Sequence, residues 1–185
     1  MSIKKLLIAV ISLLCTITIG ISTTVAYFIS NTGPVINTFT VGNVSLSLSE
    51  TTGTEYQMIP GTTIAKDPLV TVHGGSEECL VYVKLERVNG FDDYVTFEIA
   101  DGWTKLGGFD GIYYRTVEKS GVDKVYNVIK GNKITIKNNL SKEKMAAIDT
   151  QNLPEINITA FAIQTLGIES AADGWYNILS VYGGD

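Results

Sequence analysis

The chain has 185 residues, 45% of them hydrophobic, and its 19 acidic against 14 basic side chains give a net charge of −5. This length suits one globular domain with a sizeable core. The acidic balance argues against a nucleic-acid partner and against an anionic membrane surface, because a negative protein surface repels phosphate groups.

The first 26 residues have the pattern of a secretory signal peptide. Lys4 and Lys5 precede an uncharged, mostly apolar stretch that ends at the small residue Ala26, just before Tyr27. A basic start, an apolar middle and a small-residue exit are the parts of such a peptide, so we expect a signal helix over 1–26 that is cleaved between Ala26 and Tyr27. The chain then contacts a membrane only through this peptide, before cleavage.

Two alternatives to cleavage remain open. Residues 6–25 are long enough to span a bilayer as a retained anchor. Cys15 could instead carry a lipid, although Leu14 before it is not the small residue that the lipidation pattern requires. Cleavage would leave Cys79 as the single cysteine, and secretion without disulfides fits a Gram-positive surface. The neighbouring Glu77 and Glu78 disfavour its thiolate, so we expect an inert, buried thiol.

Residues 27–41 form an extended segment without a helical period, followed by a change of phase. Phe39 and Val41 occupy odd positions, whereas Val44, Leu46 and Leu48 occupy even ones. A shift of one residue turns every side chain to the opposite face of a sheet. We therefore expect a bulge or bend at Gly42, with the residues before it on a different surface from those after it.

Alternation of apolar and polar residues, typical of half-buried strands, dominates residues 42–185. A turn at Gly131-Asn132 predicts a hairpin. The expected strands cover residues 44–48, 69–73, 81–86, 95–99, 111–117, 125–131, 133–137 and 155–164. Short strands separated by frequent turns predict an all-β fold, a jelly-roll-like antiparallel β-sandwich.

One or two short helices complete the expected domain. Ser141 can cap a helix over 142–149, and Ser170 can cap a C-terminal helix in which Trp175 and Ile178 share one face. Gly174 should weaken the second helix by about 1 kcal/mol relative to alanine.

Catalytic and metal-binding patterns are missing, so we predict no enzyme activity, no catalytic residue, no metal site and no cofactor. His73 is the only histidine, whereas zinc motifs of the His-Glu-x-x-His kind need two, and we expect it to be an exposed residue at a strand end. Asp92 and Asp93 lack the ligand spacing of a calcium loop. Several tyrosines, Tyr82, Tyr94, Tyr113, Tyr114 and Tyr126, could bind carbohydrate from exposed strand faces or serve as cross-strand packing.

Three segments together resemble the TasA/camelysin family of Gram-positive secreted proteins. They are VAYF with NTFTVGNVSLSLSE near the start, YQMIPGTTIAKDPLVTV in the middle, and ITAFAIQTLGIESAADGWYNIL near the end. The resemblance implies an alternative-type signal peptide cut by a signal peptidase of the endoplasmic-reticulum type. It further implies a jelly-roll domain whose copies form biofilm-matrix fibres by donor-strand exchange. Camelysin is described as a surface metalloprotease, but this chain lacks a zinc motif. Gly174 and the Gly33-Pro34 pair depart from the family pattern.

The leading hypothesis is therefore a secreted structural protein of the biofilm matrix or cell surface, whose partner is another copy of itself. The candidate assembly strand is 27–41, with Tyr27, Phe28, Val35, Phe39 and Val41 as the residues that enter a neighbour. Assembly with paralogous matrix proteins is left open. The alternatives are a monomeric module that binds cell-wall glycan and a camelysin-like metalloprotease.

Overall fold

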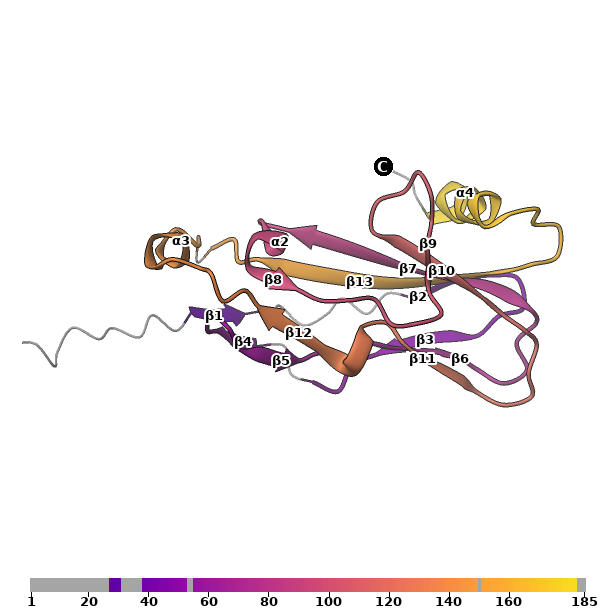
Figure 1. Ribbon diagram of the computed structural model, residues 1–185. Helices are drawn as coiled ribbons and strands as arrows, with labels where there is room; N and C mark the ends of the chain where they lie inside the picture. Colours follow the sequence, from indigo (N-terminus) through magenta and orange to yellow (C-terminus); the bar gives the residue numbers. More distant parts are fainter. Residues whose placement is uncertain (1–26, 31–37, 53–54, 150, 183–185) are drawn as a thin grey trace, which may run out of the picture.

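The computed structural model describes residues 27–30, 38–52, 55–149 and 151–182, and it is mostly β-sheet with a few short helices (Figure 1). The strands are β1 (Tyr27–Ser30), β2 (Thr38–Val41), β3 (Leu46–Ser49), β4 (Glu55–Met58), β5 (Thr63–Ala65), β6 (Leu69–Val72), β7 (Cys79–Val88), β8 (Val95–Thr96), β9 (Thr104–Lys105), β10 (Ile112–Val117), β11 (Lys124–Asn127), β12 (Lys133–Ile136) and β13 (Glu155–Gln164). The helices are α2 (Phe91–Tyr94), α3 (Lys142–Ala146), α4 (Ala171–Tyr182) and the 3₁₀ turn η1 (Lys130–Asn132).

The described strands form a sandwich-like arrangement of two layers. A five-stranded sheet in the order β2-β13-β7-β10-β9 makes one layer, and the three-stranded sheet β11-β6-β3 faces it, with the sheets β5-β12-β8 and β1-β4 toward one end (Figure 1). The described strand pairs are antiparallel, as expected, except that β2 runs parallel to β13. A parallel pair needs a long connection between its strands. Most of the chain, from residue 42 to residue 154, provides it here.

The larger core lies between the two layers. The predicted alternation of β3 is confirmed, because Val44, Leu46 and Leu48 are buried whereas Ser45 and Ser49 are exposed. The opposite sheet contributes buried residues at every second position of β7 and β13. These include Val81, Val83, Leu85, Ile156, Ile158 and Ala160. Burial of this apolar surface is the main force that holds the layers together.

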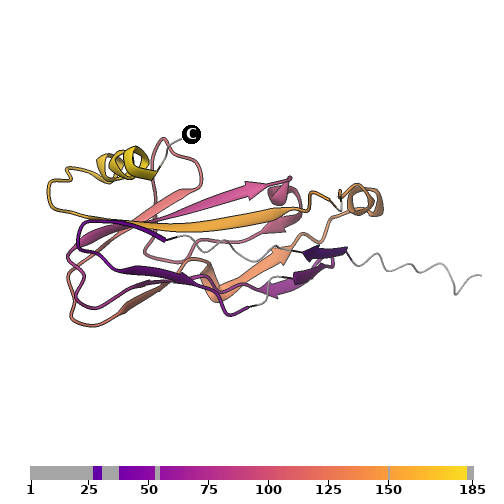
Figure 2. The same cartoon turned by 180° about the vertical axis from the view of Figure 1, so that it is seen from behind.

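A second core lies on the outer face of the five-stranded sheet, under α4 (Figure 2). Leu80, Tyr82, Phe161 and Ile163 face the helix residues Trp175 and Ile178 across it. The prediction of a half-buried strand at 81–86 is wrong for its first part. Because α4 covers the outer face, β7 is buried on both faces over Leu80–Val83, and Tyr82 has no exposed surface. The sequence did not indicate this burial, because tyrosine takes the place of an outward-facing polar residue in the alternating pattern.

Gly42 marks the predicted change of phase, and the structure confirms it. β2 belongs to the five-stranded sheet, whereas β3, only a few residues later, belongs to the opposite layer. Gly42 has a φ of +89°, which L-residues with a side chain rarely adopt, and an added Cβ would lie 2.9 Å from the side chain of Gln164. The chain therefore crosses between layers at a position that favours glycine.

Two local predictions are wrong. Gly131 and Asn132 do form a turn with positive φ, but β11 pairs with β6 and β12 pairs with β5, so no hairpin forms there. The consecutive residues Val128 and Ile129 are both fully buried, which breaks the alternation and carries the chain to another sheet. The expected strand 95–99 shrinks to β8 and one isolated bridge at Ile99.

Both helix caps are confirmed. The Ser141 hydroxyl accepts a hydrogen bond from the Lys144 amide, although α3 ends at Ala146 and is shorter than predicted. The Ser170 hydroxyl accepts from the Asp173 amide at 3.2 Å and donates to the Asp173 carboxylate at 2.8 Å. Such capping satisfies amides at a helix start that have no partner within the helix.

Candidate assembly site

β2 lies at an edge of the five-stranded sheet, where Thr38–Val41 pair with Ala160–Ile163 of β13 (Figure 2). The odd-numbered side chains of β2 point toward the helix-covered core. Phe39 stacks on Phe161 with 5.2 Å between ring centres, and both Phe39 and Val41 are partly buried against this cluster. The two residues predicted as plugs are thus in contact with apolar surface, within their own chain.

The last turn of α4 closes over β2 from outside. The Tyr182 hydroxyl donates a hydrogen bond of 2.8 Å to the backbone carbonyl of Thr40. Its ring centre lies 4.7 Å from that of Phe39. Tyr182 therefore joins the C-terminal helix directly to the N-terminal strand through one polar and one aromatic contact.

The approach of α4 to the sheet depends on Gly174. The Tyr82 hydroxyl passes beside this glycine and donates a 2.7 Å hydrogen bond to the Ala171 carbonyl. A Cβ at position 174 would overlap the Tyr82 hydroxyl and would lie 3.2 Å from Leu80. The sequence predicted that Gly174 weakens the helix. The structure shows that the absence of a side chain at this position lets the Tyr82 hydroxyl pack against the helix.

The other described part of the candidate strand is β1, which pairs antiparallel with β4. Tyr27 lies opposite Met58, and Phe28 lies opposite Gln57. Ala26, on the N-terminal side of the predicted cleavage, and the predicted plug Val35 lie outside the described residues. The described portions of 27–41 are thus both strands, each paired on one side with the same chain.

β13 extends beyond the strand that covers its edge. Among the described residues, β2 pairs only with Ala160–Ile163, so Glu155–Thr159 have a strand neighbour on the β7 side alone. Ile156 and Ile158 of this stretch border a small cleft, together with Leu48 of β3 and the side chains of Glu50 and Lys66.

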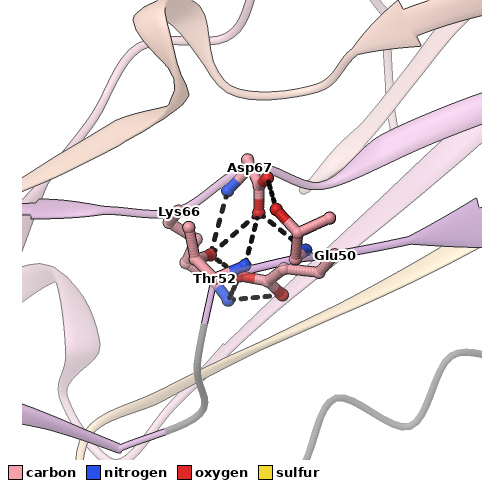
Figure 3. Close-up of polar contacts among 5 residues, drawn as sticks. Glu50, Thr52, Lys66 and Asp67 are labelled. Carbon is pink, nitrogen blue, oxygen red and sulfur yellow. Dashed lines mark hydrogen bonds and ion pairs between the residues drawn. The ribbon is translucent and has the colours of Figure 1, made fainter.

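A buried ion pair borders the same cleft. The Lys66 ammonium lies 2.8 Å from a carboxylate oxygen of Glu50, and these side chains are only 5% and 6% exposed. The Thr52 hydroxyl oxygen lies 3.0 Å from the same Glu50 oxygen (Figure 3). The sequence alone did not predict the burial of Lys66 or its partner.

Asp67, next in the chain, holds the turn after β3. Its carboxylate accepts hydrogen bonds from the backbone amides of Thr51 and Thr52, at 3.0 and 2.9 Å, and from both of their hydroxyls (Figure 3). Partial desolvation raises the pKa of Asp67, but these hydrogen bonds outweigh it and lower the pKa to about 2. Asp67 therefore stays ionised and fixes the chain where β3 leaves the cleft.

His73 is partly exposed at the end of β6, as predicted, and it also links three segments. Its ring nitrogens lie 2.9 Å from the Ser47 hydroxyl and 3.2 Å from the Asp123 carboxylate. Asp123 also accepts from the Gly74 amide at 2.9 Å. The hydrogen bond from Gly74 and the one with His73 lower the pKa of Asp123. This cluster lies on an open three-stranded sheet, where it ties β3 and β6 to the segment before β11.

The remaining candidates divide between core and surface. Cys79 is buried, and burial followed by the nearby Glu78 raises the pKa of its thiol to about 11, which fits the inert thiol expected from the sequence. Of the tyrosines, Tyr113 packs against the core between the layers, whereas Tyr114 packs against the core under α4. They lie on opposite faces of β10 and do not form one carbohydrate platform. Asp92 and Asp93 lie in the first turn of α2.

Within the described residues, no group of three or more histidine, cysteine, aspartate or glutamate side chains is arranged to hold a metal ion. No helix in the same part of the chain is long and apolar enough to cross a membrane. Comparison of the chain with protein-family models, curated proteins and solved structures finds no match.

Proposed function

We propose that this protein is a secreted structural subunit that assembles into fibres of the biofilm matrix or cell surface. In the proposed assembly, residues 27–41 of one copy complete the sheet of the next copy, within a jelly-roll domain. The observation that carries the proposal is the position of β2, an edge strand attached by a main-chain ladder and by the Phe39 ring.

The physical basis is exchange of identical contacts. Every contact that β2 makes with β13, Phe161 and Tyr182 of its own chain is also available on a second copy. Such swapping costs little, and a head-to-tail exchange that does not close into a ring produces an open filament. Gly42, at the end of β2, is the place where the strand can change direction away from its own domain.

The signal-peptide pattern and the TasA/camelysin resemblance support export of the chain before assembly. Cleavage by a signal peptidase of the endoplasmic-reticulum type after Ala26 would free the strand-forming end that begins at Tyr27. Mass spectrometry of the exported protein should therefore find Tyr27 at the N-terminus. An N-terminus at Met1 would leave the segment tethered to the membrane and would contradict this step.

Electron microscopy of the exported protein tests the assembly itself. We expect filaments for the wild type and a loss of filaments for Phe39→Asp, because a carboxylate cannot enter the apolar contact with Phe161. Thr38→Asp is the matched control, since Thr38 lies next to Phe39 on the same strand but is exposed. Filaments that persist in Phe39→Asp would contradict the role of β2.

Deletion of residues 27–41, which removes all of β2, provides a second test. We expect the truncated protein to keep its core between the layers and to form no filaments. A synthetic peptide of the deleted sequence should raise its melting temperature, because a ligand of the native state stabilises that state by mass action. Normal polymerisation of the truncated protein, without a thermal shift from the peptide, would exclude strand exchange. Wall binding by a truncated monomer would instead favour the glycan-binding alternative.

A further inference from the structure

A second feature, independent of strand exchange, lies along the side of the sandwich where β10 and β11 approach one another. Arg115 of β10 lays its guanidinium group over two aromatic rings, 3.7 Å from the ring centre of Tyr126 and 5.3 Å from that of Trp103. Trp103 is itself fixed, because its indole N–H donates to the Asn127 carbonyl at 2.8 Å. Gly102 leaves space for the group, since a Cβ there would lie 2.9 Å from a terminal nitrogen of Arg115.

Arg115 has no polar partner among the described residues. Its Nε atom is buried without a hydrogen-bond acceptor, and no ion pair involves its guanidinium in this part of the chain. The nearby carboxylate of Asp101 pairs instead with Lys130 at 3.4 Å. Burial lowers the pKa of Arg115, as expected for a cation without a compensating anion.

The terminal nitrogens of this half-buried arginine, rather than its covered Nε atom, are the donors that a bound ion can reach. Arginine is also the residue best suited to such an ion, because its planar group binds carboxylate, phosphate or sulfate through two parallel hydrogen bonds. The excess of acidic over basic residues makes an uncompensated arginine more notable here.

The guanidinium lines a pocket of about 350 Å³, together with Lys130, Tyr126, Asn127 and Asp101. This volume lies within the range of roughly 300–1,000 Å³ that is usual for small-molecule sites. Lys130 also lines the pocket, and its ammonium pairs with the carboxylates of Glu98 at 3.7 Å and Asp101 at 3.4 Å. The carboxylate of Asp101 is 89% exposed and opposes an incoming anion. The pocket therefore combines a fixed cation with a carboxylate that limits affinity.

We propose that this pocket is a binding site for a small ligand that carries an oxyanion, with Arg115 as its principal contact. A carboxylate on an acidic sugar and an inorganic phosphate or sulfate share the chemistry that Arg115 recognises. Lys130 contributes attraction from the rim, and Tyr126 and Trp103 hold the guanidinium in place for binding.

Nuclear magnetic resonance of the ¹⁵N-labelled protein tests the site, because the two tryptophans of the chain give separate indole signals. Sodium glucuronate, phosphate and sulfate are each titrated against chloride at constant ionic strength. We expect the Trp103 indole and the amides of Asn127 and Gly131 to shift saturably, while the Trp175 indole under α4 stays unchanged. Stronger binding of glucuronate than of phosphate and sulfate would identify a carboxylate ligand, and the reverse would identify an inorganic oxyanion.

Three variants assign the effect to the pocket. Arg115→Gln should weaken binding at least about tenfold, the loss expected for a charge-assisted contact. Asp101→Asn should strengthen it, because it removes the opposing carboxylate, while Lys130 keeps its ion pair with Glu98. Lys142→Gln removes the same charge from an exposed helix start and should leave binding unchanged.

Asp101→Asn keeps the test valid if Arg115→Gln does not fold, since Asp101 is a surface residue. The proposal is overturned if no salt gives a saturable shift at Trp103. It is also overturned if Arg115→Gln binds as well as the wild type, or if Asp101→Asn fails to strengthen binding.

Discussion

Replacement of Gly174 by alanine tests the structure against the sequence pattern, because the two predict changes of opposite sign in the free energy of unfolding. Helix propensity alone predicts that alanine stabilises the interior of α4 by about 1 kcal/mol. The structure places the Tyr82 hydroxyl where the new methyl group would lie, and Leu80 3.2 Å away. Overpacking typically costs about 2 kcal/mol, and the loss of a buried tyrosine hydrogen bond about 1 kcal/mol more.

The expected net result is a loss of about 2 kcal/mol in the free energy of unfolding, after the gain in propensity is subtracted. For a chain of this size, that corresponds to a melting temperature lower by about 4–8 °C. Urea denaturation followed by circular dichroism measures the free energy, and calorimetry measures the temperature. Gly107→Ala is the matched control, because no atom lies within 4 Å of the added Cβ there.

A double-mutant cycle identifies the cause of this loss. Tyr82→Phe removes the hydroxyl and its bond to Ala171, at a cost of about 1 kcal/mol. In the double variant, the alanine methyl group occupies the space that the hydroxyl has left, so the two losses should not add, with a coupling of about 1 kcal/mol or more. Strict additivity, or a Gly174→Ala protein as stable as the wild type, would refute the packing argument.

Three further predictions concern the Glu50–Lys66 ion pair, the Asp67 carboxylate and the contact of Tyr182 with β2. Lys66→Met should destabilise the protein by about 3–5 kcal/mol, because it leaves Glu50 buried without its partner, whereas the double variant Lys66→Met/Glu50→Gln should recover most of the loss in denaturant titrations. The pKa of Asp67 is lowered from 3.8 to about 2, so its contribution to the free energy of unfolding is present above the unfolded pKa and is lost as the pH falls toward 2. In Asp67→Asn, the free energy of unfolding should therefore depend less on pH between about 4 and 2, and its pH dependence near neutral pH should be unchanged. Tyr182→Phe removes the hydrogen bond to Thr40 and should speed hydrogen exchange of the β2 amides, while amides of β7 exchange as before.

Local patterns predicted much of the fold correctly, because they depend on neighbouring residues. The strand at 155–164, the caps at Ser141 and Ser170 and the break at Gly42 all follow from short-range chemistry and appear in the structure. The alternation also placed Val44, Leu46 and Leu48 correctly in the core.

Long-range contacts could not be read in the same way. A tyrosine in an alternating strand does not reveal that a helix ninety residues later will cover it, so Tyr82 was expected at the surface. The Glu50–Lys66 pair likewise joins two segments whose charges are unremarkable in the sequence. Arg115, Trp103 and Tyr126 come from three separate segments, and only the approach of β10 to β11 brings them together.

In the proposed assembly, the balance between a closed subunit and an exchanged one should depend on Gly42 more than on the contacts of β2. Phe39 and Thr40 would make the same contacts in both states, so changes to them weaken both. Gly42 differs, because its φ of +89° and the 2.9 Å approach of Gln164 to an added Cβ describe the closed form. Gly42→Ala should therefore destabilise the closed subunit by about 1–2 kcal/mol, the usual cost of a left-handed conformation for an L-residue with a side chain. At a fixed protein concentration, sedimentation should then find a larger fraction of filaments than in the wild type. An unchanged fraction would mean that the exchanged strand keeps the same conformation at Gly42, and that strand exchange does not use this residue as its hinge.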